Sequence, residues 1–271
     1  MDEDAEEEVF LPLRPVFGDT LSNRRERQIA EHMTRHREQG RQPGRRARGL
    51  TVADIVTAAV AVADDEGPEA VSMRRIAREL NVGTMSLYWY VSSKEELHRL
   101  MLERVQAEAE VPEPSGDWQA DLRSYAGTMR AALLRHPWAI DFLGSGPPSG
   151  PNDARNAERL METLDGLGLD IARTMRVLMT FVTYVMGAAL REIQEIRFQE
   201  SVAEATVGMT EDEVGESIAE YGRRIRESGR YPHLAHLLDE DIDPDSPLTR
   251  DERFEFGLDC VLAGIAARLG L

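Results

Sequence analysis

The sequence predicts an all-α fold, in which a small helical domain near the N-terminus precedes a larger helical domain. Two observations predict this fold class. After residue 49, apolar residues recur at positions i, i+3 and i+4, which places them on one face of a helix. Serine, threonine, glycine and proline separate these stretches, and helices begin and end at such residues. We expect an extension over residues 1–48, a first domain over 49–105 and a second over 106–271.

The composition is that of a soluble globular chain. Its 271 residues are 42% hydrophobic and 30% charged, which suits one large or two smaller domains. The single cysteine, Cys260, has no intrachain partner, so we expect it in the core of a protein from a reducing cytoplasm. The first ten residues are acidic where a signal peptide is basic, and the longest apolar run, residues 177–190, is too short for a bilayer, which needs about 20 residues.

The net charge of −17 belongs mainly to the second predicted domain. Residues 106–271 carry 30 acidic and 16 basic residues, whereas residues 1–48 carry ten of each. Within the extension, residues 21–48 hold nine arginines against three glutamates. We therefore expect a basic arm, flexible or partly helical, that can meet phosphate while the acidic bulk faces away.

The first helix of the small domain is expected to begin after Thr51. Thr51 can cap it, with Asp54 at the third position behind the cap, and Gly67-Pro68 stops it. Its predicted apolar face consists of Val52, Ile55, Val56, Ala59, Val60 and Ala63.

Two short helices joined by a tight turn follow. Ser72 caps the first of them, Asn81-Val82-Gly83 forms the turn, and Thr84 opens the second, which we expect to end near Val91. A steep crossing needs a small residue between the helices and a turn that tolerates unusual φ, and Ala77 and the turn supply both. The pattern favours a helix-turn-helix, whose second helix enters the major groove of DNA. An ordinary helical hairpin is the alternative.

A fourth helix is expected to begin at Ser92 or Ser93. Either serine can cap it, with Glu95 or Glu96 returning the capping hydrogen bond. Just before it, residues 88–90 are three consecutive aromatic residues, which cannot all face one core because neighbours on a helix point about 100° apart. At least one ring should therefore lie on an exposed surface. The predicted inward face of the fourth helix consists of Leu97, Leu100, Met101 and Val105.

The small domain resembles the DNA-binding domain of the tetracycline-repressor (TetR) family of bacterial regulators. The resemblance covers residues 51–105 and is carried by TVADIVTAAVAVADDEGPEAVSMRRIARELNVGTMSLYWYVSSKEELHRLM, above all by its ending LYW-x-V-x-x-K-x-x-L. The second domain resembles the regulatory domain of the tetracycline-repressor subgroup more loosely, through GDWQADLRSYAGTMRAALLRHP, FLGSGPP and FEFGLDCVLAGIAARL. Residues 198–248 match poorly. The resemblance implies a cytoplasmic homodimer that binds a DNA operator and, as a repressor, is released by a small molecule.

The resemblance also implies which residues of the third helix meet DNA. Thr84, Met85 and Ser86 stand at the exposed start of the recognition helix, and Tyr88 and Tyr90 offer a hydroxyl to phosphate and a ring face to a thymine methyl. Trp89 is either a DNA contact or a structural residue. We take the DNA-binding set to be Ser72, Arg74, Thr84, Met85, Ser86, Tyr88, Trp89, Tyr90 and Lys94.

Two cations of this set have distinct implied roles. Arg74 has the planar fork that grips guanine O6 and N7, and the matching place in the family reads a base. Lys94, the only lysine of the chain, can bind a phosphate together with the free N–H groups at the start of the fourth helix. Arg75 and Arg78 are expected to form a solvated basic face.

The second domain is predicted to contain a long helix over residues 170–199 and a last helix over residues 249–269. The long helix is apolar nearly all round and should be buried on both sides, as a helix between a ligand cavity and a dimer seam would be. In the last helix two glycines, seven residues apart, let another helix approach closely. The family builds its dimer from these two helices, which implies an interface that includes Phe254, Gly257, Leu258, Val261, Gly264 and Ile265.

An effector site is implied for the segments that line the family's cavity. Methionine side chains adapt to bulky apolar ligands, although such residues are more often plain core. The candidates are Trp138, Phe142, Met161, Met175, Met179, Phe181 and Tyr184. The tetracycline repressor holds its ligand as a magnesium chelate through a histidine and a glutamate. Here Phe142 stands at the histidine position, and the glutamate position holds Arg191, or Glu192 after a one-residue shift. A phenyl ring and a guanidinium cannot ligate magnesium, so we expect a largely apolar effector and no metal or cofactor.

Enzyme motifs are missing: the sequence has no glycine-rich phosphate loop, no HExxH and no nucleophile elbow. His233 and His236 are expected in a surface loop rather than at a metal. The acids of residues 239–252 do not fit a calcium loop, because Pro244 and Arg250 occupy its glycine and glutamate positions. Two alternatives to the ligand-released repressor stay open, an activator or ligand-independent regulator with a protein partner, and a helical enzyme or scaffold that only resembles a regulator.

Overall fold

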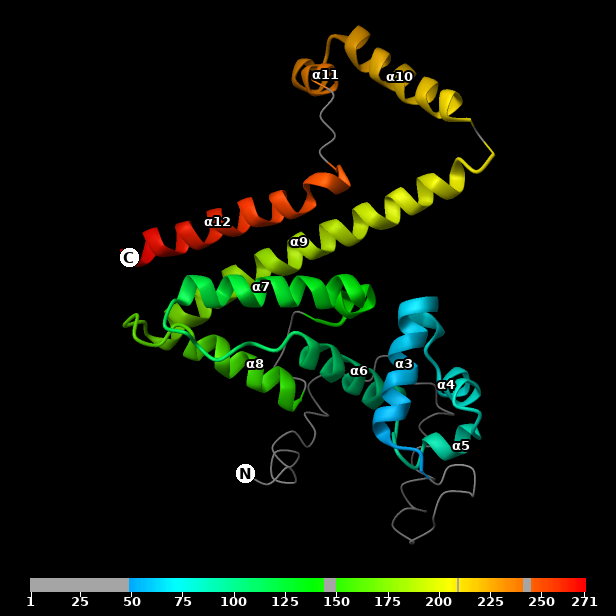
Figure 1. Ribbon diagram of the computed structural model, residues 1–271, viewed down its shortest axis with the longest axis vertical. Helices are drawn as coiled ribbons and strands as arrows, with labels where there is room; N and C mark the ends of the chain where they lie inside the picture. The colour runs from blue at the N-terminus through cyan, green and yellow to red at the C-terminus, as the bar shows by residue number, and fades with distance from the viewer. Residues whose placement is uncertain (1–48, 144–149, 209, 241–244) are drawn as a thin grey trace. The chain divides into compact units, whose positions relative to one another are not determined.

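The computed structural model describes residues 49–143, 150–208, 210–240 and 245–271, and these residues form helices and no strand (Figure 1). The predicted extension over residues 1–48, the turn at 144–149 and part of the acidic loop lie outside the described residues. The helices are α3 (Val52–Glu66), η2 (Pro68–Ala70), α4 (Met73–Glu79), α5 (Thr84–Leu87), α6 (Lys94–Glu108), α7 (Trp118–Arg135), η3 (Pro137–Asp141), α8 (Pro151–Glu162), α9 (Ile171–Ala205), α10 (Glu211–Ser228), α11 (Pro232–Asp239), η4 (Pro247–Thr249) and α12 (Arg250–Leu269).

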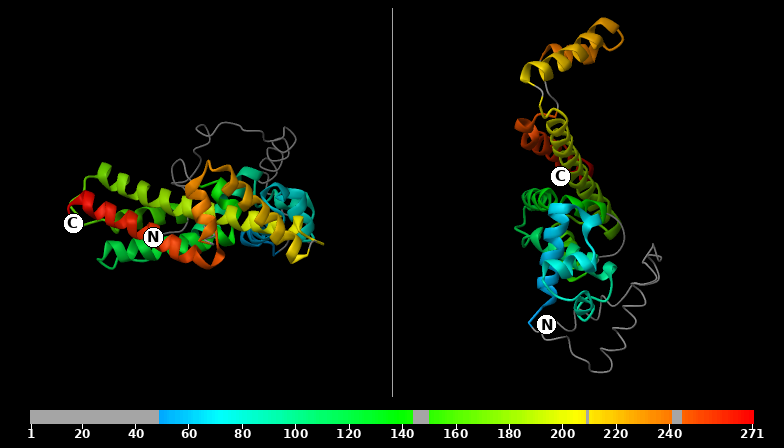
Figure 2. Two further views of the ribbon diagram at one scale, coloured as in Figure 1. Left: turned by 90° about the horizontal axis from the view of Figure 1, so that it is seen from above. Right: turned by 90° about the vertical axis from the view of Figure 1, so that its right-hand side faces the viewer.

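The chain divides into two compact units, and the boundary falls within α9. The first unit ends at Met186 and the second begins at Gly187. In the first unit, α3, α4 and α5 cluster together in all three views (Figures 1 and 2), and α6 packs against α3, α7 and α8. Among the described residues, no helix is long and apolar enough to cross a membrane.

Helix α3 begins with the predicted capping box. The Asp54 N–H donates to Thr51 Oγ1 at 3.1 Å, and the Thr51 N–H donates to the Asp54 carboxylate at 2.9 Å. The hydrogen bonds from Thr51 hold the pKa of Asp54 below its usual value. Gly67 ends the helix with a φ of +84°, which glycine adopts without strain. The apolar face begins at Ile55 rather than at Val52, because Val52 lies in the exposed first turn.

Helices α4 and α5 form the predicted pair. The Arg75 N–H donates to Ser72 Oγ at 3.2 Å, so Ser72 caps α4 as expected. Asn81 takes a left-handed φ of +52°, a conformation that asparagine tolerates, and the Val82 N–H closes the turn on the Ala77 carbonyl at 2.9 Å. Helix α5 ends at Leu87, earlier than predicted, and residues 88–90 form a turn.

Helix α6 resolves the choice of cap left open by the sequence. Ser93 is the cap, because its Oγ accepts the Glu96 N–H at 3.1 Å, and the Glu96 carboxylate accepts the Ser92 N–H at 2.5 Å. The inward face contains the buried side chains of Leu97, Met101 and Val105.

The remainder of the first unit is built on α7 and the first half of α9. The apolar stripe of α7 is buried at Leu122, Tyr125, Met129 and Leu133. The Tyr125 ring lies 6.2 Å from the fully buried ring of Phe181 on α9, centroid to centroid, and burial raises the pKa of the tyrosine.

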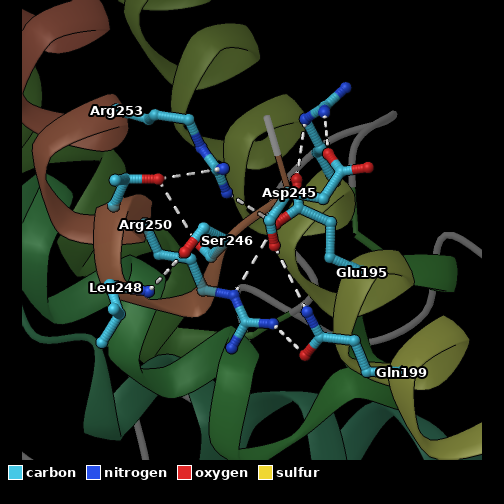
Figure 3. Close-up of polar contacts among 9 residues, drawn as sticks. Glu195, Gln199, Asp245, Ser246, Leu248, Arg250 and Arg253 are labelled. Carbon is cyan, nitrogen blue, oxygen red and sulfur yellow. Dashed lines mark hydrogen bonds and ion pairs between the residues drawn. The ribbon is translucent and has the colours of Figure 1, made fainter. Parts of the chain in front are cut away.

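The second unit is held by an ionic cluster around Glu195, whose side chain is only 6% exposed (Figure 3). Arg253 Nη2 lies 2.6 Å and Arg250 Nε 3.6 Å from Glu195 Oε2, which joins α12 to α9. Arg191 lies 2.8 Å from Glu195 Oε1 and also pairs with Asp245. Charges buried in this way must be paired to be tolerated.

Two expectations for the second unit were wrong. Cys260 is exposed and is not part of the core, because α12 turns a different face, Phe254, Leu258, Leu262 and Ile265, into the unit. His233 and His236 lie on the surface as expected, but on helix α11 rather than in a loop, because Pro232 starts a helix at its first turn.

Candidate nucleic-acid interface

The start of α5 has the geometry expected of a recognition helix. Leu87 is completely buried and anchors the helix, whereas Met85 is 45% exposed and Thr84 and Ser86 are half-buried. Leu87 is separated from the first residue of α5 by three positions, so the anchor and the open end belong to one helical turn. The N-terminal residues of α5 are therefore available to a partner, whereas its last residue is fixed in the core.

The three aromatic residues that follow α5 have different environments. Tyr88 is only 5% exposed, whereas Trp89 and Tyr90 are half-buried. The expectation that the Tyr88 ring faces a thymine methyl does not fit this burial. Because α5 ends at Leu87, the chain turns and carries the Tyr88 ring inward, and Trp89 and Tyr90 are the rings with accessible surface.

Arg74 and Arg75 on α4 are adjacent in sequence but not equivalent. Arg74 is exposed and makes no ion pair within the described part of the chain. Arg75 is half-buried: its Nη2 lies 2.6 Å from Glu66 Oε1 and its Nη1 lies 2.7 Å from Glu79 Oε2. The hydrogen bond from Arg75 holds the pKa of Glu66 below its usual value. Arg75 is thus a structural residue and not part of the solvated basic face that we expected, whereas Arg78 is exposed.

Lys94 is the first residue of α6, directly after its Ser93 cap, and its side chain is half-buried. The first N–H groups of a helix have no partner within it, and the partial positive charge there favours an anion. Lys94 therefore stands where an ammonium group and backbone N–H groups can share one phosphate. Ser72 caps α4 two residues before Arg74 and is half-buried.

The seven predicted effector residues do not share one environment. Trp138 and Phe181 are buried, Met161 and Tyr184 are half-buried, and Phe142, Met175 and Met179 are exposed. The second unit includes a cavity of about 300 Å³ between α10 and α11 and one of about 200 Å³ beside Arg191 and Asp245. None of the seven lines either cavity.

The predicted dimer residues also divide into two groups. Phe254, Leu258 and Ile265 are buried within the chain, Gly257 and Val261 are half-buried, and Gly264 is exposed. A Cβ placed on Gly264 would meet nothing within 4 Å. Phe256, which is 72% exposed, and Cys260 lie on the outer side of α12, outside the predicted set.

Comparisons with known proteins agree on one family. Residues 55–101 match the model of bacterial regulatory proteins of the tetR family, and residues 111–269 match the tetracyclin repressor-like C-terminal domain. The chain is 38% identical over 229 residues to the transcriptional repressor DrrR1 of Streptomyces coeruleorubidus, covering 83% of this chain and 81% of that protein. It is 29% identical over 147 residues to the class E tetracycline repressor of Escherichia coli, covering 53% and 69%.

A solved structure supports the same assignment. The Streptomyces coelicolor TetR family protein ActR, crystallised in complex with actinorhodin, superposes with a TM-score of 0.61 at 29% identity, covering 80% of this chain and 96% of that one. These relatives regulate transcription and are not enzymes. The chain belongs to the TetR family and is a transcriptional repressor of that family.

Proposed function

We propose that the chain acts as a homodimer on a two-fold symmetric DNA operator and is released from it by a small, largely apolar molecule. The observation that carries the proposal is the contrast between the completely buried Leu87 and the open first turn of α5. Arg74 lies on helix α4, which packs against α5, and its guanidinium has no ion pair among the described residues. A recognition helix requires a fixed register and a free N-terminal turn.

The contacts follow from the placement of each side chain. Thr84, Met85 and Ser86 approach base edges in the major groove, and Arg74 reads a guanine. Lys94 binds a phosphate at the start of α6 and sets the register without reading sequence. We keep Ser72, Trp89 and Tyr90 as flanking contacts, whereas Tyr88 acts through its hydroxyl or supports the helix from inside.

The dimer is proposed to form on the outer side of α12. The side chains of Phe256 and Cys260 are exposed there, and the open space beside Gly264 leaves room for a second helix to approach. A second copy of the chain would cover them, and a two-fold dimer explains why the operator should be a palindrome. The originally predicted residues Gly257, Val261 and Gly264 fall at the edge of this surface.

The effector is proposed to bind in the C-terminal domain. ActR has been crystallised with actinorhodin and with (S)-DNPA, so a related protein accommodates small molecules. The exposed Met175, Met179 and Phe142 offer apolar surface to such a molecule. Arg191 is engaged by Glu195 and Asp245, and a guanidinium does not ligate magnesium, so the effector should bind without a metal. A cytoplasmic location follows for a protein that acts on DNA.

The experiment is gel-shift titration of the full chain on DNA that flanks its own gene, with a scrambled duplex of equal length as control. We expect a complex of two chains on one duplex, formed at lower protein concentration on the flanking DNA than on the scrambled one. Equal affinity for the two duplexes would refute operator binding, and a complex of one chain on one duplex would refute the dimer.

A further inference from the structure

Met85 is the exposed apolar side chain of the proposed recognition helix. Helix α5 has four residues, and Leu87, two positions after Met85, is completely buried. Side chains two positions apart on a helix point about 200° apart, so the packing that holds Leu87 in the core directs Met85 outward. Met85 is accordingly 45% exposed. Its exposure follows from the way in which α5 is anchored.

An exposed side chain of this kind is uncommon in the small domain. Among residues 49–108, which the structure describes in full, the exposed large apolar side chains are Met85 and Val52, at 45% and 37%. Val52 lies in the first turn of α3, on a different helix. Removing apolar surface from water is favourable, so a partner that covers Met85 would gain free energy of binding.

The residues at the start of α5 offer different chemistry to a base edge. Thr84 and Ser86 are half-buried and carry hydroxyl groups, which can donate to or accept from any base. Met85 has no donor, and its thioether sulfur is only a weak acceptor. It therefore gains from contact with an apolar group. In the major groove of unmodified DNA, the apolar group on a base edge is the C5-methyl of thymine.

The residue before α5 leaves room for a close contact. Gly83 is the N-cap residue, with a φ of −72° and a ψ of 139°, which other residues adopt freely. A Cβ placed on it would meet Ser86 Oγ at 3.7 Å, an ordinary van der Waals contact. The left-handed position of this turn is instead Asn81, with a φ of +52°. Neither the backbone nor the packing requires a glycine at residue 83, so its missing side chain leaves the approach to α5 open.

We propose that Met85 reads a thymine in each half of the operator by packing on its C5-methyl group, and that Gly83 lets α5 come close enough to do so. Tyr88, which was expected from the sequence to meet such a methyl, is only 5% exposed. A T·A pair is then preferred to a C·G pair, whose cytosine presents an amino group and no methyl. The inference rests on the proposed operator binding and adds the base that one position of α5 selects.

The first test removes the methyl group from the DNA. The full chain selects an operator from unmodified random-sequence DNA, and each thymine of that operator is then replaced by deoxyuridine, symmetrically in both half-sites. Deoxyuridine pairs as thymine does and lacks only the methyl. By fluorescence anisotropy, at least one position should lose about fourfold in affinity for each methyl removed, the factor that corresponds to one buried methyl-sized group. Unchanged affinity at every position would overturn the proposal.

The second test assigns the methyl group to Met85 by a double-mutant cycle. Met85→Ala should bind the thymine operator more weakly than the wild type and should bind the thymine and deoxyuridine duplexes with nearly equal affinity. Val52→Ala, at the other exposed apolar side chain, is the matched control and should keep the difference between the two duplexes. A wild-type difference in Met85→Ala, or a lost difference in Val52→Ala, would refute a direct contact of Met85.

The third test examines the space in front of α5. Gly83→Ala adds a methyl group that the backbone and the neighbouring atoms accept, so the Tm should stay close to that of the wild type. Operator affinity should fall, because the added group stands between α5 and the DNA. Unchanged affinity, or a fall in Tm that accounts for the lost affinity, would contradict the close approach.

The selection step separates this inference from the proposed function. An enriched operator that binds equally well with every thymine replaced by deoxyuridine would support operator binding and refute methyl reading by Met85. The absence of any enriched sequence would refute operator binding and the inference with it. An enriched operator that loses affinity at one symmetric thymine, with the loss absent in Met85→Ala, is the result that we expect.

Discussion

The two units of the chain use their charged residues in different ways. In the helix-turn-helix, Arg74 is exposed and unpaired among the described residues, and Lys94 lies at a helix start. In the second unit, Arg250 and Arg253 pack on a glutamate that is only 6% exposed (Figure 3). The paired arginines of the second unit hold elements of the chain together, whereas Arg74 is left open. We therefore expect an exposed cation without an internal partner, rather than charge alone, to indicate a DNA contact.

The largest effect is expected at the enclosed cluster. Glu195→Ala removes the carboxylate that the half-buried Arg250 and Arg253 share, which should lower the free energy of unfolding by about 1.5–3 kcal/mol, the range for hydrogen bonds to charged groups. Chemical denaturation measures this loss. Glu200→Ala, at an exposed position of the same helix, is the control and should change stability by less than about 0.5 kcal/mol. Similar stability of the two variants would show that the cluster is not a structural element.

A smaller effect is expected at the helix start. Lys94→Ala should weaken binding to specific and random DNA alike, because a phosphate contact carries no sequence information. The slope of log affinity against log salt concentration should become shallower by about one unit. Titrations at several salt concentrations give this slope directly. A slope equal to that of the wild type would mean that Lys94 touches no phosphate.

The smallest effect on DNA is expected at Arg75. Its guanidinium is held by Glu66 and Glu79, so Arg75→Ala should reduce stability slightly and leave operator affinity nearly unchanged. Gel-shift titration of the folded variant, with its Tm measured in parallel, tests this expectation. A loss of operator affinity without a loss of Tm would assign Arg75 to the DNA surface and would break the distinction between paired and unpaired arginines.

In the small domain, helix starts could be predicted from the sequence because they depend on neighbouring residues. The caps at Thr51 and Ser72 depend on residues three positions away, and both are confirmed. The family assignment is also confirmed, because the ending of the recognition segment is specific. The predicted end of α5 near Val91 was wrong, because the helix stops at Leu87. Tyr88 is buried through packing that no local pattern encodes.

Contacts between residues that are far apart in the chain could not be predicted from the sequence. His136 contacts Asp64 and Glu108, which lie 72 and 28 residues away in the sequence, and no local pattern indicates these contacts. Cys260 was placed in the core because its neighbours are apolar, yet α12 is apolar on more than one side and only one of them is used within the chain. The predicted DNA, effector and dimer residues stay predictions until they are measured.

The most direct test of operator reading compares Arg74→Ala with Arg75→Ala on two duplexes, an operator selected by the wild type from random-sequence DNA and a scrambled control. Arg74→Ala should lose about 1–3 kcal/mol on the operator and much less on the control, since a base contact specifies whereas a phosphate contact only positions. Arg75→Ala should lose little on either duplex. Equal losses of Arg74→Ala on the operator and on the scrambled duplex would contradict the account.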